Sequence, residues 1–187
     1  LLMNSANTVL DEIETLRCRK NTSIVRSDDG SFTVSAAPTP GYANTDEGYA
    51  AYLAASGQGT GALRLSEIMA AEKLFTAPDG TLCDWIEIEN TSSKDFSLAG
   101  YYLSDEAGKG KYCFPAGTVV PARGYLVVWC SPDEEGDYAP FALRKAGGET
   151  VCLMNENRTV LDSAETVACQ SGQSLVRSAD GTLIPSD

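Results

Sequence analysis

Glu87 and Glu89 are the two residues of this sequence that are best spaced for acid–base chemistry. They belong to an alternating segment in which Ile86 and Ile88 point one way and the glutamates point the other. Two carboxylates on one strand face could act as a general acid and a general base. The same alternation is typical of a solvated sheet face with arginine or lysine neighbours, and we favour that interpretation.

The acidic run at residues 133–137 is the best candidate for a metal site. Asp133, Glu134, Glu135 and Asp137 flank a glycine, and carboxylate oxygens in such a loop are the hard ligands that calcium prefers. The spacing is not that of an EF-hand, and acidic hairpin loops are common. We therefore expect a solvated turn, with no bound metal or other cofactor.

The sequence contains no histidine, so it lacks the base of Ser-His-Asp and Cys-His catalysis. Its six cysteines are far apart and include no C-x-x-C pair, which argues against a structural zinc site. An even number of cysteines permits disulfides. However, Cys130 and Cys152 lie in apolar, strand-like segments, as buried thiols do. We expect mostly free thiols and no enzymatic activity.

Three aromatic residues, Trp85, Tyr101 and Tyr102, are candidates for an exposed platform that binds a sugar or a peptide. Packing in the core is the alternative, and for Trp85 and Trp129 it is the interpretation that we prefer. A contiguous platform beside polar groups would favour ligand binding, whereas scattered aromatic residues would favour a structural role.

Glu67 follows Leu63 and Leu65 at alternate positions of an apolar segment. Strict alternation predicts that its carboxylate is buried on the same face as the two leucines. A buried carboxylate needs a cation or backbone donors to stay ionised, so we expect a structural ion pair at Glu67.

The formal charge is −12 and the isoelectric point is near 4.4. An acidic surface repels phosphates, so nucleic acids and anionic membranes are not expected partners. No apolar run approaches the ~20 residues of a membrane helix, so no membrane insertion is expected. Residues 1–4 lack the basic start and the apolar stretch of a signal peptide, and we interpret the chain as a mature piece of a longer protein.

Short apolar segments separated by glycine, proline and asparagine turns run through residues 62–187 and predict an all-β sandwich. The predicted strands are 62–69, 83–90, 101–104, 111–114, 119–121, 125–130, 141–144, 150–154 and 159–169. The predicted core includes Ile86, Ile88, Leu126, Val128 and Leu153. Ahead of the sandwich, Asn44 and Glu47 predict the start of one short helix, which a Gly-rich linker follows.

Residues 1–30 and 152–181 are two versions of one segment. Asp11 matches Asp162, Cys18 matches Cys169, and the other matches keep the same offset of 151 residues without a gap. That period is far longer than the ~20–50 residues of a solenoid unit and indicates tandem whole domains. We therefore expect a C-terminal fragment of a preceding repeat at 1–44, a short helix and linker at 45–61, and a complete domain at 62–187.

Five motifs in order, at suitable spacing, resemble the lamin-tail domain family, and its bacterial branch most closely. They are LSEI at 65–68, DWIEIEN at 84–90, LAGYYL at 98–103, FPAGT at 114–118 and GYLVVW at 124–129. The resemblance covers residues 62–187 and, through the repeat, residues 1–36. It implies an immunoglobulin-like β-sandwich.

The resemblance also implies a function. Bacterial members of this family are typically non-catalytic interaction or spacer modules in secreted or surface-attached multidomain proteins. Nuclear lamins have been linked to nucleic acid, but this acidic chain lacks the basic surface for that role. We therefore expect an extracellular or cell-surface module that contacts other protein domains or a surface polymer. A carbohydrate- or peptide-binding module is the alternative, and a homodimer through residues 1–36 is possible.

Overall fold

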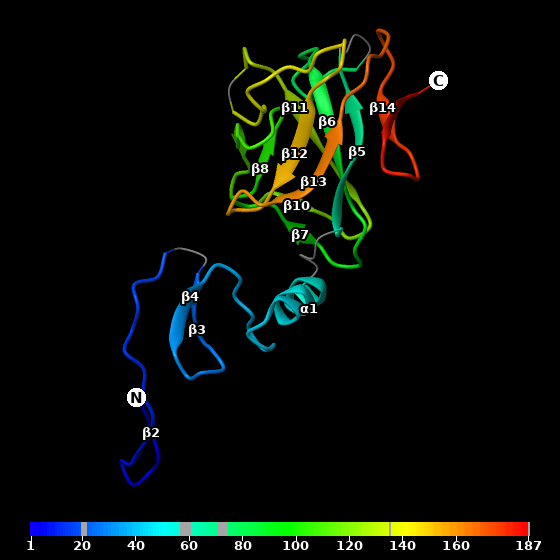
Figure 1. Ribbon diagram of the computed structural model, residues 1–187. Helices are drawn as coiled ribbons and strands as arrows, with labels where there is room; N and C mark the ends of the chain where they lie inside the picture. Colours follow the sequence, from blue (N-terminus) through cyan, green and yellow to red (C-terminus); the bar gives the residue numbers. More distant parts are fainter. Residues whose placement is uncertain (20–21, 57–60, 71–74, 135, 187) are drawn as a thin grey trace. The chain divides into compact units, whose positions relative to one another are not determined.

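The computed structural model describes residues 1–19, 22–56, 61–70, 75–134 and 136–186 (Figure 1). The chain divides into two compact units, Leu1–Gly59 and Thr60–Asp187, and each unit is described by itself. Of the described residues, those between 46 and 56 form one helix, and most other regular structure is β-strand. That helix is not long and apolar enough to cross a membrane, and no other described segment is a helix that could.

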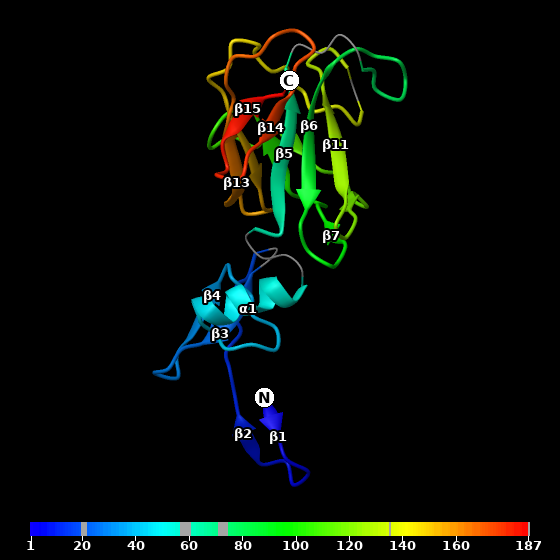
Figure 2. The same ribbon diagram turned by 90° about the vertical axis from the view of Figure 1, so that its right-hand side faces the viewer.

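The first unit contains two short antiparallel hairpins and the helix (Figure 2). Asn4 holds the turn of the first hairpin, because its side-chain oxygen accepts two backbone N–H groups of that turn. The elements are β1 (Leu2–Met3), which pairs with β2 (Val9–Asp11), β3 (Ser23–Arg26), which pairs with β4 (Phe32–Ser35), and α1 (Asp46–Ser56).

The helix α1 is present, but its cap differs from the predicted one. Thr45 caps it, since the Thr45 hydroxyl accepts a hydrogen bond from the Gly48 N–H at 3.0 Å. Asn44 instead accepts a hydrogen bond from the Thr39 hydroxyl at 2.9 Å. A Cβ at position 48 would lie 1.9 Å from a backbone carbonyl oxygen, so the tight entry into the helix requires glycine there.

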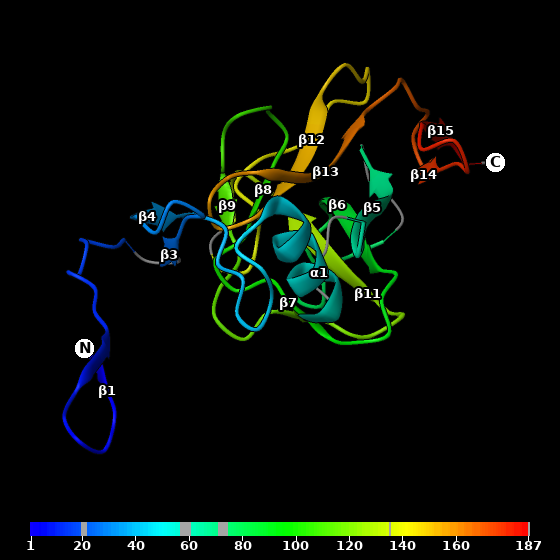
Figure 3. The ribbon, with the colours of Figure 1, turned by 60° about the horizontal axis from the view of Figure 1, so that its bottom comes forward.

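The second unit is a sandwich of two antiparallel sheets, which confirms the predicted all-β, immunoglobulin-like class. One sheet has the order β11-β6-β5-β14-β15, the other has the order β13-β12-β8-β9, and β7 pairs separately with β10. In Figure 3, β5, β6 and β11 lie on one side and β8, β12 and β13 on the other. The strands are β5 (Leu63–Met69), β6 (Asp84–Asn90), β7 (Phe96–Ser97), β8 (Tyr102–Ser104), β9 (Tyr112–Cys113), β10 (Val119–Val120), β11 (Tyr125–Cys130), β12 (Thr150–Met154), β13 (Val160–Glu165), β14 (Leu175–Arg177) and β15 (Leu183–Pro185).

The core lies between the two sheets, as the alternation predicts. Ile86, Ile88 and Leu153 are fully buried and Val128 is nearly so, while Leu126 is partly buried against the same cluster. The side chain of the buried Asn90 donates hydrogen bonds to two backbone carbonyls at 2.8 and 3.0 Å, which satisfies a polar group at the end of β6.

The predicted strand at 141–144 is wrong. The N–H of Leu143 donates to an Asp84 carboxylate oxygen at 2.8 Å, and the N–H of Arg144 donates to a Glu149 carboxylate oxygen at 2.6 Å. Carboxylates thus satisfy backbone donors that a neighbouring strand would otherwise bind. The predicted strand at 159–169 is also too long, because β13 ends at residue 165.

The burial of Glu67 is also wrongly predicted. β5 contains a β-bulge at Ser66: Leu65 pairs with Ile88, and Glu67 pairs with Glu87. One extra residue reverses the alternation, so Leu65 is buried and Glu67 is only partly buried, on the outer face. Strict alternation cannot anticipate a bulge.

Residues 1–36 have the strand pairing of their counterparts in the sandwich. Leu2 pairs with Asp11, as Leu153 pairs with Asp162, and in both hairpins the register shifts between this leucine and the methionine that follows it. β3 and β4 likewise pair in the register of β14 and β15. In the first unit, however, the apolar side chains of β1 and β2 are exposed, whereas Leu153 is fully buried.

Candidate functional site

Glu87 and Glu89 lie on the outer face of β6, as predicted, but each has its own partner. Glu89 forms an ion pair with Arg64 on β5, with 2.5 Å between the Arg64 Nε and a carboxylate oxygen. Glu87 accepts a hydrogen bond from the Ser66 hydroxyl at 2.6 Å. This arrangement is that of a partnered sheet surface rather than of an acid–base pair that shares one proton.

In the acidic loop, Asp133, Glu134 and Asp137 are exposed, and Glu135 lies outside the described residues. Within the described part of the chain, no three histidine, cysteine, aspartate or glutamate side chains form a group that could hold a metal ion. The expectation of a solvated turn without bound calcium stays a prediction.

The candidate aromatic residues do not form one platform. Tyr101 is buried, and its ring packs edge-on against Phe96 with 5.6 Å between centroids, so it cannot present a surface to a ligand. Tyr102 is partly buried on β8, in the other sheet, with the Arg158 guanidinium 5.3 Å from its ring centroid. Of the three candidates, Trp85 lines a cavity.

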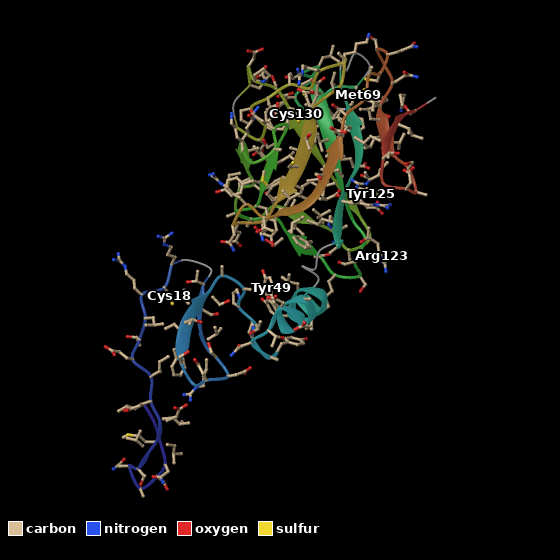
Figure 4. All side chains as sticks on the ribbon, viewed as in Figure 1. Cys18, Tyr49, Met69, Arg123, Tyr125 and Cys130 are labelled. Carbon is tan, nitrogen blue, oxygen red and sulfur yellow. The ribbon has the colours of Figure 1, made fainter. Side chains whose placement is uncertain are left out.

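Trp85 shares this cavity with Trp129. The two tryptophans lie opposite each other on β6 and β11, and Met69 lies opposite Trp85 on β5. Figure 4 labels Met69, at the end of β5. The cavity has a volume of about 500 Å³, within the range of ligand pockets in proteins. We call it the tryptophan groove and define it by Glu67, Met69, Phe75, Trp85, Val127 and Trp129.

Sequence analysis assigned Trp129 to packing and missed Met69, Phe75 and Val127. Alternation along β11 does place Val127 and Trp129 on one face. What it cannot supply is the strand pairing, which brings Trp129 beside Trp85. Phe75 follows β5 in the chain and is 56% exposed, so no periodic pattern indicated its place in the groove.

Glu67 is the acidic group of the tryptophan groove. Its cross-strand neighbour is Glu87, so two glutamates occupy opposing positions on adjacent strands. Among the residues that the structure describes, no lysine or arginine forms an ion pair with either carboxylate. Like charges at opposing positions destabilise a sheet unless a cation approaches them.

The six cysteines are free thiols, and four of them are buried. Burial raises the pKa of the Cys130 thiol well above its usual range, and it also raises the pKa values of Cys83, Cys152 and Cys169. Because the thiolate is the reactive form, these four cysteines are poor nucleophiles at neutral pH. Their role is packing.

The sequence matches a family model. It is the model of the lamin tail domain, and the match covers residues 56–168. The matched range includes both tryptophans of the groove, the bulge of β5 and most of the two sheets. No curated protein matches the chain.

Proposed function

The chain belongs to the lamin tail domain family, and from this premise we propose that it is a structural or protein-interaction module of a secreted or cell-surface multidomain bacterial protein. Lamin tail domains are immunoglobulin-like and in general non-enzymatic. The secreted bacterial setting draws its support from the motifs at 65–129 and from the charge of −12, which keeps an isolated domain soluble.

The tryptophan groove is the observation that best supports a role in binding a partner protein. Aromatic side chains held on a rigid sheet bury a large area at small entropic cost, and tryptophan is enriched where proteins bind partners. Beside the groove, Glu89 forms an ion pair with Arg64, and Glu87 accepts a hydrogen bond from Ser66. The surface suits recognition better than proton transfer.

We also propose that residues 1–44 belong to a preceding lamin-tail repeat and that residues 45–61 connect it to the sandwich at 62–187. The shared register of the hairpins supports this organisation. So does an ion pair: Arg26 binds Asp11, as Arg177 binds Asp162 at the corresponding positions. Tandem modules of this kind serve as spacers or as multivalent contact surfaces.

A second candidate function is the binding of a carbohydrate or a free peptide. Two tryptophans in one groove favour it, because sugar rings stack on planar aromatic side chains. The scattered positions of Tyr101 and Tyr102 count against an extended sugar platform.

Biolayer interferometry of the immobilised chain tests whether it binds a protein or a polysaccharide, and an activity assay tests whether it is an enzyme. The analytes are the neighbouring domains of the parent protein and soluble cell-wall polysaccharides. Saturable binding of a protein domain supports the proposed function, and binding of polysaccharide alone supports the second candidate. Turnover of chromogenic ester, glycoside or phosphate substrates would overturn a non-catalytic role, provided that Glu87→Gln abolishes the turnover.

A further inference from the structure

We propose that the tryptophan groove binds an arginine or lysine side chain of a partner protein, with the aliphatic stem on the tryptophans and the cationic head at Glu67. This inference rests on the proposed function as a protein-interaction module and identifies the surface and the chemistry that it recognises.

The strand pairing arranges the sheet face that carries the groove as two parallel rows across β5, β6 and β11. One row is apolar and consists of Met69, Trp85 and Trp129. The other row consists of Glu67, Glu87 and Val127. Because side chains on one face of a strand are two residues apart, the rows are separated by about 7 Å.

That spacing suits a cationic side chain with a long apolar stem. A guanidinium or ammonium group is attracted to the face of a tryptophan within about 6 Å of the ring centroid. A cation lying between the rows can therefore contact an indole ring on one side and the Glu67 carboxylate on the other. The methylene groups of its stem can pack on the apolar row, in which Trp85 and Trp129 are partly buried and Met69 is 2% exposed.

The acidic row places two glutamates at opposing positions, an arrangement that favours a cationic ligand. Glu67 and Glu87 are cross-strand neighbours, and neither forms an ion pair with any described residue. Glu89, further along the same strand, shows the contrast, because Arg64 neutralises it. With a net charge of −12, the whole chain also attracts a basic partner over longer distances.

A neutral sugar would use the tryptophans but would leave Glu67 and Glu87 uncompensated. An acidic or phosphorylated ligand would be repelled by them. A basic segment of a protein is thus the ligand class that can both pack on the tryptophans and neutralise the charge of the glutamates.

Tryptophan fluorescence provides a specific readout, because the chain has only two tryptophans and both line the groove. The probe is the peptide acetyl-Gly-Val-Arg-Val-Gly-amide, titrated into the full chain with excitation at the red edge of the absorption band. Two further probes are the same peptide with citrulline, a neutral isostere, in place of arginine, and cellohexaose. We expect saturable quenching by the arginine peptide that weakens as salt is added.

The variants Glu67→Gln and Glu165→Gln form a matched pair, since each removes one negative charge, and Glu165 is exposed on the opposite sheet. We expect Glu67→Gln to weaken binding of the arginine peptide by about fivefold and Glu165→Gln to change it by less than about twofold. Circular dichroism of both variants serves as the control for folding.

Three results would overturn the inference: equal affinity for the citrulline peptide, equal effects of the two variants, or tighter binding of cellohexaose. Absence of quenching by every probe would also overturn it. That last outcome leaves the proposed function intact if interferometry still detects a protein partner, so the two failures are distinguishable.

Discussion

Arg177 and Asp162 form a two-pronged ion pair that joins the two sheets of the sandwich. The guanidinium nitrogens lie 2.7 and 3.0 Å from the carboxylate oxygens, and both side chains are about 85% buried. Asp162 on β13 also accepts a hydrogen bond from the N–H of Leu65 on β5 at 2.7 Å. The corresponding pair of the first unit, Arg26 and Asp11, is about half exposed.

Loss of the buried pair should destabilise the sandwich. In Asp162→Asn the Arg177 guanidinium stays partly buried without its counter-charge, although the asparagine oxygen can still accept the Leu65 N–H. We expect a loss of about 2–3 kcal/mol of unfolding free energy, measured by urea denaturation. The matched control, Asp11→Asn, removes the exposed pair and should leave the midpoint of the sandwich unchanged. Equal effects of the two variants would show that burial does not set the strength of this pair.

The turn between β14 and β15 should respond to acid. The Ser178 hydroxyl and the Thr182 N–H donate hydrogen bonds to Asp180 and lower the pKa of its carboxyl group to about 2. A carboxyl pKa that is lower in the folded state stabilises the fold above the unfolded pKa of about 3.9. This contribution is lost as the pH falls from about 4 through 2. NMR titration of the Asp180 side-chain carbon checks the value, and a midpoint near 3.9 would contradict it.

The cysteines should divide into two kinetic classes. Cys18 and Cys113 are exposed, whereas the other four thiols are buried, with raised pKa values. We expect two thiols to react rapidly with a chromogenic disulfide reagent in the native protein. All six should react after unfolding in denaturant without prior reduction. Finding nearly no reactive thiols in the unfolded chain would instead establish disulfides.

Calcium should change the thermal midpoint by less than about 2 °C at millimolar concentration, because Asp133, Glu134 and Asp137 are exposed and solvated. Differential scanning calorimetry with calcium, with magnesium and with a chelator measures the effect. A rise of several degrees that is specific to calcium would establish a site at the acidic loop. Asp133→Asn should then abolish that rise.

Local sequence patterns were enough to predict the core of β6 but not the whole of β5. Ile86 and Ile88 alternate along an unbroken strand, so their burial follows from the pattern alone. On β5 the bulge at Ser66 moves Glu67 to the outer face, and a bulge depends on the partner strand. The same limit explains the groove: alternation gives the face of each tryptophan, whereas only the strand pairing makes Trp85 and Trp129 neighbours.

The segment at 141–144 illustrates a second limit. Its apolar residues have the composition of a strand, and Phe141 and Leu143 are indeed buried in the core. Its backbone N–H groups, however, are bound by Asp84 and Glu149 rather than by a sheet. Burial was therefore predictable from composition, whereas the hydrogen-bond partners were not: one is Asp84 on β6, 59 residues from Leu143, and the other is Glu149, in the segment that follows.

The exposed apolar side chains of residues 1–36 should drive association. Leu2 and Met3 are 61% and 42% exposed, whereas their counterparts Leu153 and Met154 are fully buried. Burial of such side chains contributes about 25 cal/mol per Å² of apolar surface, and short isolated hairpins are marginal in water. We expect residues 1–36 either to dock on a sandwich of the same kind within one chain or to exchange strands between two chains.

Light scattering after gel filtration, over a range of protein concentrations, separates these outcomes. Strand exchange gives a dimer whose fraction rises with concentration, and Leu2→Glu should then shift the chain to a monomer without lowering the unfolding midpoint of the sandwich. Intramolecular docking gives a monomer in which residues 1–36 resist protease, and Leu2→Glu should remove that resistance. The exposed Ile184 of β15 offers a matched control, since Ile184→Glu places the same charge outside this segment. A monomer whose residues 1–36 are cleaved rapidly, with no loss of sandwich stability, would contradict both forms of the prediction.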